Sequence, residues 1–124
     1  MPKRDAQKTF TLVTETITRP KTSSEFIRQG WSHYSNKEYY RAEDSFRKAL
    51  DLTPDDPDTL YALAMTLFSS GRKQESIPVY RKVIEVLNRD PDQEKGNRET
   101  MLIRMAYGHI NFIETGQWRM EAYQ

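Results

Sequence analysis

The feature that most constrains this chain is a stretch of sequence that recurs after 34 residues. The first copy is SFRKALDL, residues 45–52, and the second is VYRKVIEV, residues 79–86. Each copy contains an aromatic residue, two basic residues, and then small or aliphatic residues in the same order. A period of this size is typical of proteins built from stacked copies of one supersecondary unit, so we expect a repeat architecture.

The first copy belongs to a predicted pair of helices. Thr22 and Glu25 have the spacing of a capping box, in which the hydroxyl group and the carboxylate each bind a free amide at a helix start. Apolar residues then recur at helical spacing until Asn36 interrupts the pattern. A second helix fits residues 39–52, and Pro54 prevents it from continuing.

A second pair of helices is predicted from the next stretch. An aspartate–proline pair at residues 56–57 is a frequent start of a helix, so a third helix is expected over residues 59–70. Gly71 supplies the left-handed conformation that often follows a helix. A fourth helix is expected over residues 73–88, and Pro78 lies early enough in it to cause only a small irregularity.

The pattern is weaker in the last third of the chain. The link over residues 89–99 is longer and more polar than the link between the first two pairs. A fifth helix is predicted over residues 100–114, Gly116 ends it, and residues 118–124 start a sixth helix. The residues of the fifth helix that we expect to face inward are Met101, Met105, Gly108 and Phe112.

Helical hairpins that repeat every 34 residues resemble the tetratricopeptide repeat. In that family, small residues stand where the two helices of a unit cross, because axes about 8–10 Å apart leave no room for larger side chains. An aromatic residue lies midway along the second helix, and a proline often ends the unit. At that end this chain has Pro54 in the first unit but Asn88 in the second. The positions that match the family pattern are Gly30, Ala42, Phe46, Ala49 and Pro54, followed by Ala64, Ser76 and Tyr80.

The resemblance implies an all-α fold, a right-handed superhelical solenoid of about two and a half to three antiparallel helical hairpins. Residues 1–21 carry no convincing helical stripe, and we expect them to form an N-terminal arm that is either flexible or docked. The helical domain is expected to span residues 22–124. Its predicted division is repeat 1 at 23–56, repeat 2 at 57–90, and a degenerate, truncated repeat 3 at 99–124.

The resemblance also implies a concave groove lined by the first helix of each unit. Large aromatic and soft side chains at the groove positions are suited to an extended or helical apolar segment of another protein. Some family members hold a partner's terminal carboxylate with a polar clamp, but apolar residues such as Ala62 stand in its place here. The groove residues expected to bind the partner are Ile27, Trp31, Tyr34, Tyr61, Met65 and Phe68.

Other occupants and roles are open for the same surface. Phe10, Leu12 and Ile17 of the arm, or the third unit, could cover the groove from within the chain. The chain could instead self-associate as a homodimer, because its last residues offer no obvious polar capping helix. It could also be the adaptor part of a longer protein whose activity lies elsewhere.

Composition argues against several classes of partner. The formal net charge is +1, so nothing global favours binding to nucleic acid or to an anionic membrane. The absence of cysteine removes disulfides, thiolate chemistry and most structural zinc sites. No apolar run is long enough for a signal peptide or a membrane span, so we expect a cytoplasmic protein with no membrane partner.

Sequence motifs also argue against catalysis. No phosphate-binding loop, nucleophile elbow or metal-binding histidine pair occurs in the sequence. His33 and His109 are the only histidines, and they fall in different units without a paired carboxylate motif. We therefore expect no catalytic residues, no metal and no cofactor, and a scaffold role in protein–protein interaction.

Overall fold

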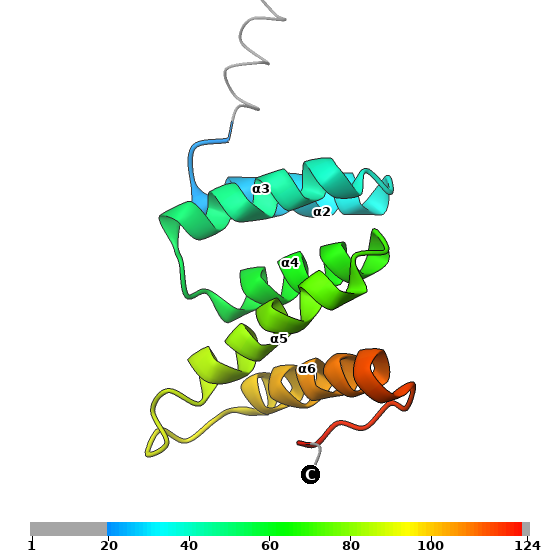
Figure 1. Ribbon diagram of the computed structural model, residues 1–124. Helices are drawn as coiled ribbons and strands as arrows, with labels where there is room; N and C mark the ends of the chain where they lie inside the picture. The colour runs from blue at the N-terminus through cyan, green and yellow to red at the C-terminus, as the bar shows by residue number, and fades with distance from the viewer. Residues whose placement is uncertain (1–19, 123–124) are drawn as a thin grey trace, which may run out of the picture.

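The computed structural model of the protein describes residues 20–122, which form a stack of helices without any strand (Figure 1). Consecutive helices run back and forth, so neighbours along the chain are also neighbours in space (Figure 1). The all-α prediction is confirmed. The helices are α2 (Ser23–Ser35), α3 (Tyr39–Leu52), α4 (Pro57–Ser69), α5 (Lys73–Leu87) and α6 (Asn97–Thr115).

Helix α2 begins at the capping box that the sequence predicted. The amide of Glu25 donates a hydrogen bond to the hydroxyl oxygen of Thr22 over 3.2 Å. The Glu25 carboxylate accepts a hydrogen bond of 2.8 Å from the amide of Lys21, one residue before the usual partner in this motif. Local contacts alone therefore fix the start of the helix.

The second hairpin also follows its local signals. Asp56 is the N-cap of α4, and its carboxylate accepts a hydrogen bond from the Thr59 hydroxyl. Gly71 has a φ angle of 86°, the left-handed conformation expected after α4. Pro78 lies inside α5, which continues to Leu87. The predicted bounds of these helices agree closely with the observed ones.

Small residues stand at the helix crossings, as the sequence pattern predicted. A β-carbon built on Gly30 would lie 2.6 Å from the ring of Phe46, so no larger residue fits between α2 and α3. In the second hairpin, Ala64, Ser76 and Tyr80 are fully buried. Each pair of helices is thus closed by one aromatic ring lying against one small residue.

Helix α4 lies between two apolar clusters and contributes to both. The first cluster joins α3 to α4 around Phe46, and includes Leu63 and Leu67. The second joins α4 to α5 and α6 around Tyr80. Because both faces of α4 are covered, most of its residues are buried.

The face that helix α6 presents to the core was predicted only in part: Gly108 is buried as expected, and Met105 is partly buried. Met101 and Phe112, which were expected to point inward, are exposed. Ala106 and Ile110 are buried instead, with Leu102 partly buried beside them. These three residues are four positions apart and form one stripe against α5, whereas the predicted stripe lies on neighbouring faces.

The predicted sixth helix is wrong within the residues described. Gly116 ends α6 in the left-handed conformation, with φ of 77°, and residues 117–122 follow without helical structure. The Trp118 ring packs against Gly108, and the carbonyl groups of Arg119 and Glu121 bind the side chain of α6 residue Asn111. A stretch this short cannot sustain a helix by itself, so these side-chain contacts determine its path.

Two further expectations concern the chain as a whole. None of the helices among residues 20–122 combines the length and apolar character needed to cross a bilayer. Of the predicted N-terminal arm, residues 1–19, with Phe10, Leu12 and Ile17, lie outside the described residues.

Candidate functional site

Aromatic and soft side chains lie along the first helices of the successive hairpins, α2, α4 and α6. We call this surface the aromatic wall. Ring contacts join α4 to α6, and a hydrogen bond between Tyr34 and Ser69 joins α2 to α4. The wall consists of Ile27, Trp31 and Tyr34 from α2, Met65 and Phe68 from α4, and His109 and Phe112 from α6.

The part of the wall on α2 is built around Trp31. This side chain is 39% exposed and meets Tyr34 edge to face, with ring centroids 5.5 Å apart. Its other neighbour is the buried ring of Phe46, at 5.3 Å. The Tyr34 hydroxyl is hydrogen-bonded to the Ser69 hydroxyl over 2.8 Å, which joins α2 to α4 across the wall. Ile27 lies partly buried against the first apolar cluster.

The part of the wall on α4 is built around Phe68, which is half-buried. Its ring lies 5.4 Å from the ring of His109 and 6.5 Å from that of Phe112, so it joins α4 to α6. The ammonium group of Lys73 lies 5.4 Å from the centroid of the Phe68 ring, within the range of a cation–π interaction. Met65 is also half-buried and packs against the second cluster.

Tyr61, which the sequence placed in the same groove, lies beneath the wall rather than on it. It is only 8% exposed, and its ring packs edge to face with Tyr80 at 5.7 Å. Its hydroxyl group is hydrogen-bonded to Nε2 of His109 over 3.1 Å. Burial raises the pKa of the Tyr61 phenol, so the neutral phenol persists at physiological pH.

His109 lies where the wall, the core and the C-terminal segment meet. Its ring stacks parallel on Tyr80 at 4.6 Å and meets Trp118 edge to face at 5.0 Å. Burial lowers the pKa of the imidazole, which favours the neutral ring in the folded protein. No role for His109 was predicted from the sequence. Aligning Gly108 with Gly30 and Ala64 is the signal that could have found it, because His109 then takes the repeat position of Trp31 and Met65.

The Tyr80 ring, on which His109 stacks, carries a buried polar atom. The Tyr80 hydroxyl is buried and has no hydrogen-bond partner among the described residues, although the rest of the ring is well packed. Burial is the largest cause that raises its pKa. The phenol therefore stays neutral and carries the cost of an unsatisfied buried donor.

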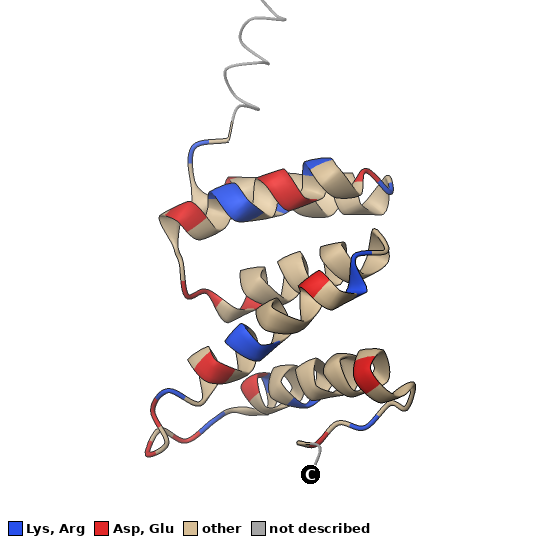
Figure 2. Cartoon of the chain, viewed as in Figure 1, with Lys and Arg blue, Asp and Glu red and all other residues tan. Residues whose placement is uncertain are grey.

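Charged residues are spread over the helices and the connections between them, including the outer helices α3 and α5 (Figure 2). Several of them pair between successive units. The Arg89 guanidinium lies 2.8 Å from the Asp55 carboxylate, and Arg98 lies 2.9 Å from Asp58. Between α3 and the start of α5, Arg72 lies 2.5 Å from Glu43. These pairs connect neighbouring hairpins and leave the wall itself largely uncharged.

The arrangement is suited to recognition. In the described part of the chain, no three His, Asp or Glu side chains lie together as they would around a metal ion. His33 pairs with Glu38, and His109 with Tyr61. The wall therefore offers apolar contact area together with a few hydroxyl groups.

Stacked helical hairpins with one aromatic–small contact per crossing define the class of helical-repeat proteins. Within this class, the tetratricopeptide repeat model matches residues 26–56 and 57–86. This chain belongs to the tetratricopeptide repeat family, whose repeats generally mediate protein–protein interaction without catalysing a reaction.

Known proteins with similar sequences support the same family. A TPR repeat-containing protein of Methanocaldococcus jannaschii is 37% identical over 60 residues, which cover 48% of this chain. The match spans only 11% of the length of that relative. No solved structure matches the chain significantly.

Proposed function

We propose that this chain is a non-enzymatic adaptor that binds an apolar segment of another protein along the aromatic wall. The bound segment, extended or helical, lies in the groove in front of α2, α4 and α6. The contact residues are Ile27, Trp31, Tyr34, Met65, Phe68 and Phe112, and Tyr61 holds His109 in position beneath them.

The observation that carries this proposal is the exposure of large aromatic rings on a connected surface. Trp31 and Phe112, which is 43% exposed, lie at the two ends of the wall, and the half-buried Phe68 lies between them. Aromatic surface that stays in water does not stabilise the folded protein. A partner that covers this surface removes it from water, which contributes favourable free energy to binding. Tryptophan and tyrosine are also the residues most enriched at binding hot spots.

The expected affinity comes from a few anchors. Truncating a hot-spot aromatic residue costs about 2 kcal/mol of binding free energy, or roughly a 30-fold loss of affinity. Trp31 and Phe68 lie on different helices and share no direct contact, so their losses are expected to be approximately additive.

The test compares three versions of the protein. Partners are captured from an extract of the source organism and purified, and their affinity is then measured for the wild type and for a Trp31→Ala, Phe68→Ala double variant. The control is Tyr40→Ala, because Tyr40 is an exposed aromatic residue on the outer helix α3. We expect the double variant to lose about 1000-fold in affinity and the control to lose little.

An unchanged affinity of the double variant would rule out the wall as the contact surface. Equal losses in both variants would point to a general effect of surface aromatic residues. Circular dichroism of each variant establishes that it is folded before its binding is compared.

Self-association is the second candidate function, and the exposed residues at the C-terminal end favour it. Met101, Phe112 and Trp118 are large apolar residues that remain accessible on or beside α6. A second copy of the chain could cover them. Light scattering of the purified protein separates the two functions, since a monomer at high concentration argues against self-association and a tight dimer argues against the adaptor role.

A further inference from the structure

The C-terminal segment, residues 117–122, takes the place that the second helix takes in the other two hairpins (Figure 1). A β-carbon on Gly108 would collide with the Trp118 ring, as one on Gly30 would collide with Phe46. The next residue repeats the likeness, because His109 meets Trp118 edge to face at 5.0 Å and Trp31 meets Phe46 at 5.3 Å. Trp118 thus imitates the aromatic residue of a second helix.

A buried side chain of α6 holds this segment in place. Asn111 is 3% exposed, and its amide group donates hydrogen bonds to the carbonyl of Arg119 over 2.7 Å and to that of Glu121 over 2.8 Å. These bonds are made to backbone atoms. They therefore depend on the path of the segment and not on its side chains.

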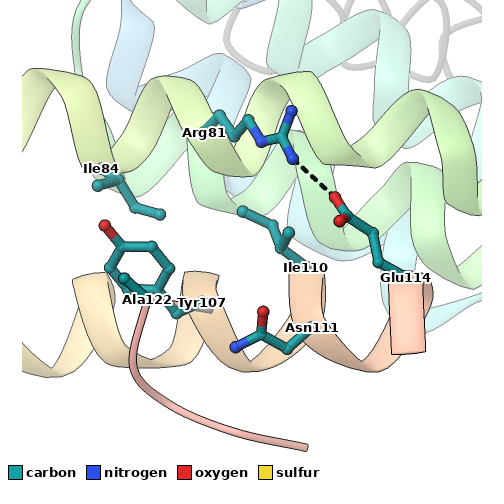
Figure 3. Close-up of a pocket in the computed structure, with 7 residues that line it drawn as sticks. All are labelled: Arg81, Ile84, Tyr107, Ile110, Asn111, Glu114 and Ala122. Atoms are coloured by element: carbon teal, nitrogen blue, oxygen red, sulfur yellow. Dashed lines mark hydrogen bonds and ion pairs between the residues drawn. The ribbon is translucent and has the colours of Figure 1, made fainter. Parts of the chain in front are cut away.

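The segment covers its face of α6 only in part. Trp118 remains 46% exposed, whereas Phe46 and Tyr80, its counterparts in the other hairpins, are fully buried. Beside the segment lies a cavity of about 330 Å³ between α5 and α6, with the Arg81–Glu114 ion pair of 2.7 Å at its edge (Figure 3). The cavity is lined by Arg81, Ile84, Tyr107, Ile110, Asn111, Glu114 and Ala122.

We propose that this face of α6 is a second docking site, which binds an amphipathic helix of a partner protein in exchange for residues 117–122. The chain itself supplies the template for that helix. Phe46 of helix α3 covers Gly30, and the buried residues Ala42 and Ala49 stand four positions before it and three positions after it. A partner helix with this pattern places its aromatic ring on Gly108, where Trp118 now lies.

The chemistry of the site favours a helix over an extended strand. Helix α6 has 19 residues, and the six residues of the segment cover only part of its length. A partner helix of about four turns can pack along most of α6, and its small side chains can then enter the cavity. This site is distinct from the proposed groove, although His109 borders both.

The experiment uses a probe taken from the chain. A synthetic peptide of residues 37–54 carries the α3 sequence, and the same peptide with Phe46→Ala is its control. The full chain is prepared with Trp31→Phe, which leaves Trp118 as the only tryptophan, since the sequence contains two. We expect the peptide to shift Trp118 emission to longer wavelength as the ring moves into water, and the control peptide to cause no shift.

Two chain variants test the site independently of that signal, with binding followed by the anisotropy of labelled peptide. Trp118→Ala removes the competing ring, so we expect affinity to rise about fivefold. Gly108→Val fills the space that the aromatic ring needs and should abolish binding, while Tyr40→Ala on the outer helix α3 should leave binding unchanged. Circular dichroism confirms that each variant retains its helices.

The proposal fails if the peptide does not bind, or if Trp118→Ala binds it no more tightly than the wild type does. It also fails if Gly108→Val leaves binding intact, because the peptide would then be exchanging with α3 elsewhere in the stack. If the groove in front of α2, α4 and α6 proves to bind no partner, the results expected here do not change.

Discussion

The two ends of the stack close the same kind of site in different ways. At the first hairpin, Gly30 is covered by Phe46 from a full helix, and that ring is fully buried. At the other end, Gly108 is covered by Trp118 from a segment without helical structure, and that ring is nearly half exposed. The comparison teaches that a small residue in the first helix specifies an aromatic neighbour, whereas the rest of the second helix determines how firmly that neighbour is held.

The largest expected effect is the difference in stability loss when each of the two rings, Phe46 and Trp118, is replaced by alanine. Phe46→Ala removes a fully buried ring and should lower the free energy of unfolding by about 4 kcal/mol. Trp118→Ala removes a ring that is already partly in water and should cost about 1 kcal/mol. Urea unfolding of both variants measures the difference. Equal losses would show that the non-helical segment is held as firmly as a helix.

The next largest effect is the difference in stability loss when each of the two glycines, Gly30 and Gly108, is replaced by valine. Gly30→Val forces a side chain into the Phe46 ring, which has no room to move, and should cost about 3 kcal/mol. Gly108→Val meets the Trp118 ring, which can swing into solvent, and should cost about 1 kcal/mol. The same unfolding measurements apply. A larger loss for the Gly108 variant would contradict the view that the C-terminal segment yields easily.

Between about pH 7.5 and about pH 5, a pH effect is expected at His109, near the C-terminal end of the stack. Because burial lowers the pKa of His109 below its usual 6.5, the neutral ring stabilises the fold above that pH. This stability is lost as the pH falls from 6.5 through the lower pKa of the folded state. Unfolding measured between about pH 7.5 and about pH 5 should therefore weaken more in the wild type than in His109→Gln. A parallel decline in both proteins would assign the pH dependence to other groups.

The smallest effect compares the two hairpins that do have a second helix. The aromatic residue is Phe46 in one and Tyr80 in the other, and the Tyr80 hydroxyl is buried without a partner among the described residues. Tyr80→Phe should therefore leave the free energy of unfolding unchanged or raise it by about 1 kcal/mol. A loss of more than about 1 kcal/mol would mean that a water molecule satisfies the hydroxyl in solution.

Local signals made the two hairpins predictable from the sequence. Thr22 with Glu25 fixed one helix start, Gly71 one helix end, and helix α3 was predicted with the bounds that it has in the structure. The crossing residues Gly30 and Ala64 followed from the 34-residue period. Each of these features depends on residues that are close in the sequence or repeated at a fixed distance.

The remaining features depend on contacts that no local pattern contains. Tyr61 is buried because His109, 48 positions later, lies against it. Gly108 of α6 is buried as predicted, but the buried residues Ala106 and Ile110, which pack with α5, were not predicted. Residues 117–122 follow a non-helical path in which Asn111 binds two of their carbonyl groups, whereas the sequence alone favoured another helix.

The position of α4 between two apolar clusters has a mechanical consequence. Residues of this helix belong both to the cluster around Phe46 and to the cluster around Tyr80, so neither hairpin can open without exposing part of the other. A pulling force applied to the two chain ends should first peel away the C-terminal segment and α6. The two hairpins joined by α4 should then rupture together in a single, larger step.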